Sequence, residues 1–244
     1  MPAIGLIIIG DEILSGKRQD KHFAHFIEAL ALRGLELSWC RIIGDTPAQI
    51  VETLQHTMAT PDIVFSCGGV GATPDDHTRR CAALAAGLPM SRHPGAVAEI
   101  EAQFGESAYP TRILMADLPQ GASLIPNPYN RIPGFKLGDH HFLPGFPMMA
   151  WPMFEWVMDT YYRKLTRTLP EASATLIVRD AVESDLMPLM QQITRDYADL
   201  RFASLPHIDT DGKWVELSVQ GQGHRVEAAK QAMLTELNNL GLHA

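Results

Sequence analysis

Two adjacent carboxylates, Asp75 and Asp76, follow a short segment that carries three glycines in four positions. A glycine-rich loop lets backbone N–H groups approach an anion closely, because glycine takes positive φ angles at little steric cost. Carboxylates beside a bound phosphate repel it unless a divalent cation lies between them, as Mg²⁺ does when carboxylates and substrate phosphates share it. The pattern therefore predicts a site for a phosphorylated ligand, with the phosphate on loop residues Gly68, Gly69, Val70, Gly71, Ala72 and Thr73. The alternative is a tight turn before a helix with an acidic N-terminus, where Asp is favoured in any case.

Two further acids stand in comparable places along the chain. Asp11 follows the apolar run 3–9, Asp45 follows the run 35–43, and the run 62–67 precedes the glycine loop. Short apolar runs bounded by turn residues are typical of buried strands. Because the carboxyl ends of parallel strands meet at one edge of a sheet, we expect these acids and the Asp75 and Asp76 pair to converge in space.

The segments between these runs have helical patterns. Apolar residues recur at helical spacing within residues 22–33, and residues 46–49 supply an N-cap, a proline and a capping glutamine. A third helical segment, residues 78–86, follows the glycine loop. This βαβαβα order predicts right-handed crossovers and a mostly parallel sheet, which defines an α/β fold.

The middle third of the chain has a weaker pattern. We expect a helix over residues 93–104, a strand over 123–125, and a helix over 148–165 that Pro152 bends or restarts. Two Pro-Gly-Phe triplets, at 133–135 and 144–146, predict rigid turns. These turns fit either the wall of a binding cleft or ordinary β-turns.

A composition break at residues 166–172 separates a first domain, 1–165, from a second domain, 170–244. The second has the order βαββα, with Asp-Gly at a hairpin turn, and predicts a small α+β unit with an antiparallel sheet. An RNA-binding KH domain needs a Gly-x-x-Gly loop between helices, and residues 221–223 lack that spacing. We expect this unit to be structural or to form oligomers.

The composition narrows the classes of partner. The net charge of −8 argues against nucleic acid, because binding to a phosphate backbone needs a basic surface. The N-terminal apolar run is too short to span a membrane and lacks the features of a signal peptide. Three widely spaced cysteines are expected to be free thiols. We therefore expect a cytoplasmic protein with no membrane partner.

Five motifs occur in an order that resembles the MoaB/Mog molybdopterin-binding domain: residues 10–16, 44–45, 68–78, 116–119 and 143–147. The match covers about residues 1–165 and is most similar to the amino-terminal domain of competence/damage-inducible protein CinA and to the corresponding domain of FAD synthases. The second domain resembles the small KH-like module that follows in CinA proteins. The resemblance implies a three-layer α/β fold that binds a phosphorylated pterin or nucleotide.

The same resemblance assigns roles to individual residues. Asp76 falls on the essential aspartate of the glycine-loop motif, and Asp45 on the acid after the second strand, so these two are the expected catalytic residues. The expected ligands of Mg²⁺, or of another divalent cation such as Mn²⁺ or Co²⁺, are Asp11, Asp45, Asp75 and Asp76. The expected substrate cleft is formed by Glu12, Ser15, Asp117, Pro133, Gly134, Pro144 and Gly145. The sequence departs from the family pattern in three places: Ala72 replaces the usual proline and is expected to loosen the loop, and residues 20–22 replace a segment that commonly ends in asparagine and contacts substrate. The change at residues 131–132 indicates a cleft wall that accepts a different ligand.

Three functions remain open at this point. The first is divalent-metal-dependent hydrolysis of a nucleotide diphosphate, as in pyrophosphatases of the ADP-ribose or FAD type. The second is binding or adenylation of molybdopterin in molybdenum cofactor biosynthesis. The third is a nucleotide-binding role without catalysis. Relatives of this type commonly self-associate, so a homo-oligomer is expected.

Overall fold

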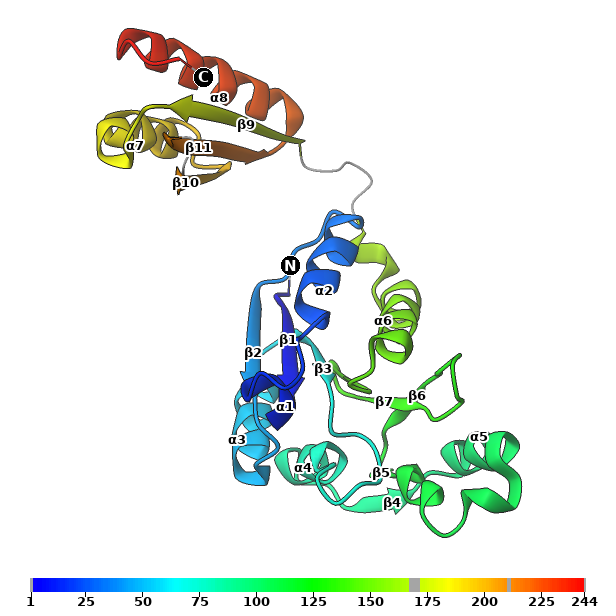
Figure 1. Ribbon diagram of the computed structural model, residues 1–244. Coiled ribbons are helices and arrows are strands. Elements are labelled where there is room, and N and C mark those ends of the chain that lie inside the picture. The colour runs from blue at the N-terminus through cyan, green and yellow to red at the C-terminus, as the bar shows by residue number, and fades with distance from the viewer. Residues whose placement is uncertain (1, 167–171, 210–211, 244) are drawn as a thin grey trace. The chain divides into compact units, whose positions relative to one another are not determined.

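The structure is a computed structural model that describes residues 2–166, 172–209 and 212–243. The chain divides into two compact units, Met1–Thr168 and Leu169–Ala244. The first unit contains the strands and helices β1 (Ile4–Ile9), α1 (Asp11–Leu14), α2 (His22–Ala31), β2 (Trp39–Ile43), α3 (Pro47–Met58), β3 (Ile63–Cys67), α4 (Thr78–Ala85), β4 (Met90–Arg92), α5 (Pro94–Phe104), β5 (Asp117–Pro119), β6 (Ser123–Ile125), β7 (Gly134–Leu137), β8 (His140–Leu143) and α6 (Pro147–Tyr161) (Figure 1). Short 3₁₀ turns occupy Gly105–Ala108, Arg112–Ala116 and Arg163–Leu165.

In the described part of the first unit, six strands form one sheet in the order β2-β1-β3-β8-β7-β6. β1 pairs in parallel with both β2 and β3, and β3 pairs in parallel with β8, whereas β7 runs antiparallel to its neighbours β6 and β8. The carboxyl ends of β1, β2, β3 and β8 therefore lie at one edge of the sheet. This edge positions the candidate site.

Helices cover both faces of this sheet, so the fold is a three-layer α/β arrangement. On one face, Leu6 and Ile8 of β1 pack with Phe26 of α2 and Phe154 of α6. On the other face, a second core joins Ile7 and Ile9 of β1 to apolar residues of α3, α4 and α5: Ile50, Leu54, Cys81, Ala82, Ala96 and Ile100. Successive residues of β1 are thus buried on opposite faces, which explains the unbroken apolar run in the sequence.

Three sequence-based expectations need correction. Residues 134–135 belong to β7 and not to a rigid turn; a side chain at Gly134 would overlap with the carbonyl oxygen of Phe142, so glycine permits the close approach of β7 to β8. The helix expected over residues 148–165 ends at Tyr161, and of the two effects expected of Pro152 a restart does not occur, because α6 runs from Pro147 through this proline. The second strand begins at Trp39, four residues later than expected.

The second unit contains β9 (Ala172–Arg179), a 3₁₀ turn (Glu183–Leu186), α7 (Met187–Asp196), β10 (Arg201–Asp209), β11 (Gly212–Gly221) and α8 (Gly223–Asn239). Its described strands form an antiparallel sheet in the order β10-β11-β9. Alternate residues of β11, namely Val215, Leu217 and Val219, are buried in a core with α7 and α8. The predicted turn at 209–212 includes residues 210 and 211, which lie outside the described residues. Across the described ranges, no helix has the length and apolar character needed to cross a membrane.

Candidate functional site

A cavity of about 470 Å³ opens at the carboxyl edge of the central sheet. This volume falls in the range of small-molecule sites. Its walls come from the ends of four parallel strands and from the loop between β6 and β7. The lining residues are Ile9, Gly10, Glu12, Arg18, Asp45, Gly68, Gly69, Val70, Gly71, Ala72, Thr73, Asp75, Asp76, Met115, Asn127, Asn130, Ile132, Pro133, Pro144, Gly145, Phe146 and Met149.

The first residues of α4 hold the carbonyl groups of the glycine loop. The hydroxyl of Thr78 donates to the carbonyl oxygen of Gly68 over 2.9 Å, and the Thr78 N–H donates to that of Gly69 over 2.9 Å. Nη2 of Arg79 donates to the carbonyl oxygen of Gly71 over 2.7 Å. Because the C=O and N–H of a trans peptide point in opposite directions, the N–H groups that follow these carbonyls are turned away from α4.

The middle of the loop has N–H groups without a partner among the described residues, whereas the N–H of Gly68 donates to the carbonyl oxygen of Leu143. Within the part of the chain that the structure describes, those of Gly69, Val70, Gly71 and Ala72 have no hydrogen-bond partner. These four residues are partly exposed, and successive unpaired backbone donors that line a cavity are suited to an anion.

Glycine is required at the start of this loop. Gly68 and Gly69 have φ angles of 115° and 65°. A Cβ atom at Gly68 would overlap with the carbonyl oxygen of Ile9, and one at Gly69 with the hydroxyl of Thr78. The hydrogen bonds to Thr78 therefore depend on the absence of a side chain at these positions.

Arg79 is a buried residue that the sequence analysis did not single out. Nη1 of its guanidinium donates to the carbonyl oxygens of Leu114 and Asp117, so one side chain ties the glycine loop to the segment that leads into β5. Burial lowers the pKa of Arg79, and the nearby carboxylates of Asp117 and Asp76 oppose this effect. The sequence does not indicate which of the adjacent Arg79 and Arg80 side chains is buried.

Asp76 closes the other end of the loop. Its Oδ2 accepts hydrogen bonds from the N–H of Thr73, over 2.9 Å, and from the Thr73 hydroxyl. The nearby Thr73 side chain and the N–H of Asp75 itself lower the pKa of the exposed Asp75 carboxyl. In the described structure, Oδ1 of Asp76 has no hydrogen-bond partner, which leaves it available to a ligand.

Asp11 and Asp45 bind each other across the ends of β1 and β2. Oδ2 of Asp45 accepts from the N–H of Asp11 over 2.8 Å, and Oδ1 of Asp11 accepts from the N–H of Asp45 over 3.1 Å. Burial raises the pKa of Asp45; the N–H of Asp11 lowers it, and the carboxylates of Asp11, Glu12 and Asp75 raise it further. The site thus concentrates negative charge around Asp45.

The predicted metal ligands do not form a cage made by the protein alone. Among residues 2–166, 172–209 and 212–243, no group of three or more His, Cys, Asp or Glu side chains is placed to hold a metal ion. Asp45, Asp75 and Asp76 line the cavity, whereas Asp11 does not. The donor set fits a cation shared with ligand oxygens, since Mg²⁺ keeps few protein ligands when phosphate completes its coordination.

The predicted substrate-cleft residues divide into two groups. Glu12, Pro133, Pro144 and Gly145 line the cavity. Ser15, Asp117 and Gly134 do not. Ser15 follows α1, Asp117 pairs with Arg92 in the β4–β5 ribbon, and Gly134 is buried at the start of β7.

Arg18 and Phe146 also line the cavity, although the sequence pattern did not predict this for either residue. The guanidinium carbon of Arg18 lies 5.6 Å from the centroid of the Phe146 ring, and its Nη1 lies 3.9 Å from Oε1 of Glu12. This arrangement brings a positive charge and an exposed aromatic ring to the lining. The sequence predicts a turn at Phe146 from the preceding Pro-Gly, but it does not predict that the Phe146 ring lines the cavity.

Comparison with known proteins places this geometry in context. Residues 5–164 match the family model described as "Probable molybdopterin binding domain". A CinA-like protein of Geotalea uraniireducens is 29% identical, over 92% of this chain and 55% of that protein. A protein of Pyrobaculum calidifontis is 25% identical, over 98% of this chain and 95% of that protein. The chain therefore spans about half the length of the CinA-like relative and almost all of the other.

One solved structure shares the fold at a level that supports comparison. The crystal structure of the protein CinA of Thermoplasma acidophilum, described as having unknown function, superimposes with a TM-score of 0.59 at 26% identity. The match covers 64% of this chain and 97% of that one.

Proposed function

This chain belongs to the "Probable molybdopterin binding domain" family, and on that premise we propose that its cavity binds a nucleotide diphosphate and hydrolyses it with a divalent cation. The observation that carries the proposal is the run of free N–H groups from Gly69 to Ala72 in one cavity with the carboxylates of Asp45, Asp75 and Asp76. Free N–H groups bind phosphate oxygens, and carboxylates beside them need a cation to offset their charge.

The glycine loop binds and orients the phosphate in this proposal. The N–H groups of Gly69, Val70 and Ala72 face away from α4 and donate to phosphoryl oxygens, where they stabilise the negative charge that develops during hydrolysis. Thr78 and Arg79 take no part in binding. They keep the carbonyl oxygens, which would repel a phosphate, turned away from it.

Asp45 and Asp76 would hold the cation through their Oδ1 atoms, which have no hydrogen-bond partner among the described residues, with Asp75 also in the cavity lining. The chemistry that a bound Mg²⁺ or similar ion supplies is polarisation of the phosphoryl group and orientation of a water molecule. The raised pKa of Asp45 fits a group whose ionised form is best stabilised by a cation.

The test is a hydrolysis assay. The protein is incubated with ADP-ribose or with FAD in the presence of Mg²⁺, Mn²⁺ or Co²⁺, and release of AMP is followed by mass spectrometry. Asp76→Asn keeps an acceptor for Thr73 but removes the charge, so turnover is expected to fall by about 100-fold or more. Asp196→Asn, in the second unit, is the matched control and is expected to leave turnover unchanged. Failure to release AMP with any metal, or full activity in Asp76→Asn, would refute the proposal.

Binding of molybdopterin without hydrolysis is the second candidate, and the description of the matching family supports it. The same free N–H groups would hold the phosphate of the pterin. Titration with molybdopterin distinguishes the two: tight binding together with no AMP release favours this candidate. Nucleotide binding with neither molybdopterin affinity nor turnover would instead indicate a non-enzymatic role.

The second unit contributes no residue to the cavity in this proposal. We propose that it mediates self-association, as expected for relatives of this kind. Light scattering on the full chain and on a chain that ends at residue 166 tests this: an oligomer is expected only for the full chain.

A further inference from the structure

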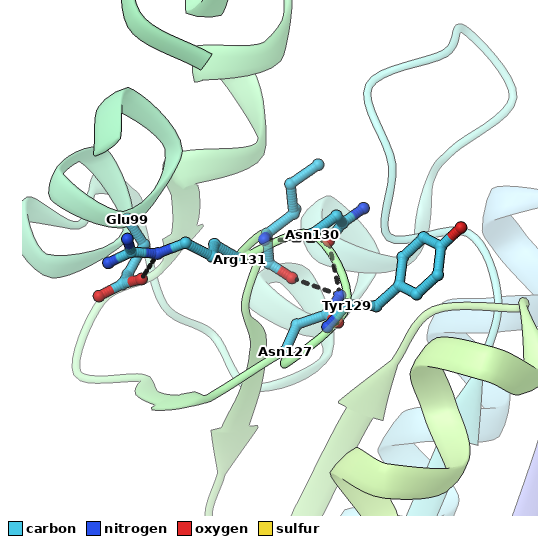
Figure 2. A network of polar contacts seen from close by, with 6 residues as sticks. Glu99, Asn127, Tyr129, Asn130 and Arg131 are labelled. Atoms are coloured by element: carbon cyan, nitrogen blue, oxygen red, sulfur yellow. Dashed lines mark hydrogen bonds and ion pairs between the residues drawn. The ribbon is translucent and has the colours of Figure 1, made fainter. Parts of the chain in front are cut away.

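The loop between β6 and β7 forms one wall of the cavity and contains two asparagines in a fixed network (Figure 2). The N–H of Tyr129 donates to Oδ1 of Asn127 over 3.0 Å, which sets the orientation of that buried amide. Nδ2 of Asn127 must then point the other way, and it donates to the carbonyl oxygen of Ile132 over 3.0 Å and to Oδ1 of Asn130 over 2.8 Å.

The orientation of the Asn130 amide follows from this network. Its Oδ1 accepts from Nδ2 of Asn127 and also from the N–H of Ile132, over 3.1 Å. Two donors therefore hold the oxygen, and Nδ2 is directed away from them, as Figure 2 shows. Within the described residues, the only partner of Nδ2 is the thioether sulfur of Met149 at 3.6 Å. Since a thioether is a weak acceptor, this amide retains strong donor capacity on the cavity side.

The loop is also anchored on the side away from Asn130. Arg131 has a φ angle of 60°, which is unusual for a residue with a side chain, and its N–H donates to the carbonyl oxygen of Asn127. Nε of Arg131 donates to Oε2 of Glu99 on α5 over 2.7 Å. Figure 2 shows the Arg131 and Asn130 side chains directed to opposite sides of the loop. The turn therefore presents the Asn130 amide in one orientation.

The Met149 sulfur that lies 3.6 Å from this donor belongs to one of several apolar side chains in the cavity lining. Ile132, Met115 and Met149 line the same cavity, and two of them are methionines, whose polarisable sulfur makes favourable contacts with aromatic rings. An oriented N–H₂ group on an apolar wall matches a flat heterocycle that buries its faces and presents a hydrogen-bond acceptor at its edge. A sugar phosphate or an inorganic diphosphate has no flat apolar face to pack against this wall.

We propose that Asn130 is a specificity-determining residue that donates to the acceptor edge of an aromatic heterocycle seated against Ile132, Met115 and Met149. This inference rests on the proposed function and narrows its substrate to a nucleotide whose base is recognised in the same cavity as its phosphate. The class includes purine and flavin nucleotides, which share a ring that carries a carbonyl or a ring-nitrogen acceptor.

The test compares phosphates that carry an aromatic heterocycle with one that carries none, by calorimetric titration. The probes are AMP, GMP and FMN, with ribose 5-phosphate as the ligand that lacks an aromatic ring. Asn130→Asp retains the oxygen that accepts from Asn127 and Ile132 but replaces the free donor with an anionic acceptor. Asn238→Asp, an exposed change of the same charge in α8 of the second unit, is the matched control.

The wild-type chain and Asn238→Asp are expected to bind at least one ring-bearing probe about tenfold or more tightly than ribose 5-phosphate. Because the new carboxylate also repels phosphate, Asn130→Asp is expected to weaken both ligands, and its loss of affinity for that probe is expected to be about tenfold greater than its loss for ribose 5-phosphate. The inference is overturned if no probe binds more tightly than ribose 5-phosphate, if Asn130→Asp keeps the preference, or if it weakens all ligands equally. Because these titrations need no turnover, their outcome is independent of the hydrolysis assay.

Discussion

Replacement of Arg79 by methionine is expected to destabilise the first unit strongly. The guanidinium donates to three carbonyl oxygens, those of Gly71, Leu114 and Asp117, and the side chain is only 9% exposed. Methionine has a similar length but no donor, so these carbonyls lose their partner. A hydrogen bond from a charged donor contributes about 1.5–3 kcal/mol, and removal of one partner from a buried charged network costs about 3–5 kcal/mol.

Water that enters the vacated space will offset part of this loss, so we expect a decrease near the lower limit, about 3 kcal/mol. For a unit of this size, 1 kcal/mol shifts the melting temperature by roughly 2–4 °C. The melting temperature of Arg79→Met should therefore fall by about 6–12 °C. Arg79→Lys should lie between this variant and the wild type, because an ammonium group cannot reach three carbonyls in the fixed geometry of the guanidinium.

Differential scanning calorimetry of the full chain measures the change, and Arg80→Met is the control. Arg80 is the next residue, is exposed, and is expected to change stability by no more than about 0.5 kcal/mol. Release of the Gly71 carbonyl should also let the Ala72 peptide rotate, so affinity for inorganic pyrophosphate should fall by about tenfold. Arg79 does not orient the loop if Arg79→Met melts within about 2 °C of Arg80→Met and binds pyrophosphate equally well. This threshold corresponds to roughly 0.5 kcal/mol, the usual scatter among surface substitutions.

Two further predictions concern charge. Burial and neighbouring carboxylates raise the pKa of Asp45 in the folded chain, so its ionised form is less stable there than in the unfolded chain. Ionisation of Asp45 therefore lowers the free energy of unfolding at pH values above the pKa of the unfolded chain. Asp45→Asn should stabilise the protein by up to about 1 kcal/mol at pH 7, and this gain should vanish towards pH 4. Urea titrations at both pH values check this, and an unchanged or lower stability at pH 7 would contradict it. Burial lowers the pKa of His140 from 6.5 to about 4, so the unfolded chain binds the proton first and stability should fall between pH 6.5 and 4 by about 1.4 kcal/mol per pH unit. His140→Gln keeps an amide near the Thr57 hydroxyl and should flatten that slope; equal slopes in both proteins would refute the assignment.

The elements that could be predicted from the sequence are those in which the local residue pattern reflects the burial of each position. β1 and β3 are buried at every position because helices cover both faces of the sheet, and α3 begins at the predicted proline. β7 and the start of β8 gave no comparable signal. The Pro-Gly-Phe triplet at 133–135 indicates a turn by its composition, yet Phe135 pairs with Leu124 and with Phe142, and these contacts decide the conformation.

The acids and the glycine loop could be proposed as a site because parallel strands bring their carboxyl ends to one edge, a rule that holds for any such sheet. The sequence could not show that Asp11 and Asp45 bind each other's N–H groups, because this depends on the distance between two separate loops. It also could not show which of Arg79 and Arg80 is buried.

The sequence alone determined the α/β class, the run of glycines that frees backbone donors, and the acids that follow the strands. These are local properties, since φ preferences and hydrophobic periodicity act within a few residues. Only the tertiary structure decided that Thr78 and Arg79 turn the loop carbonyls away from the cavity and that Asn130 presents its amide donor to it. Those orientations are set by hydrogen bonds to groups that are brought close by packing, and packing energy depends on the whole fold.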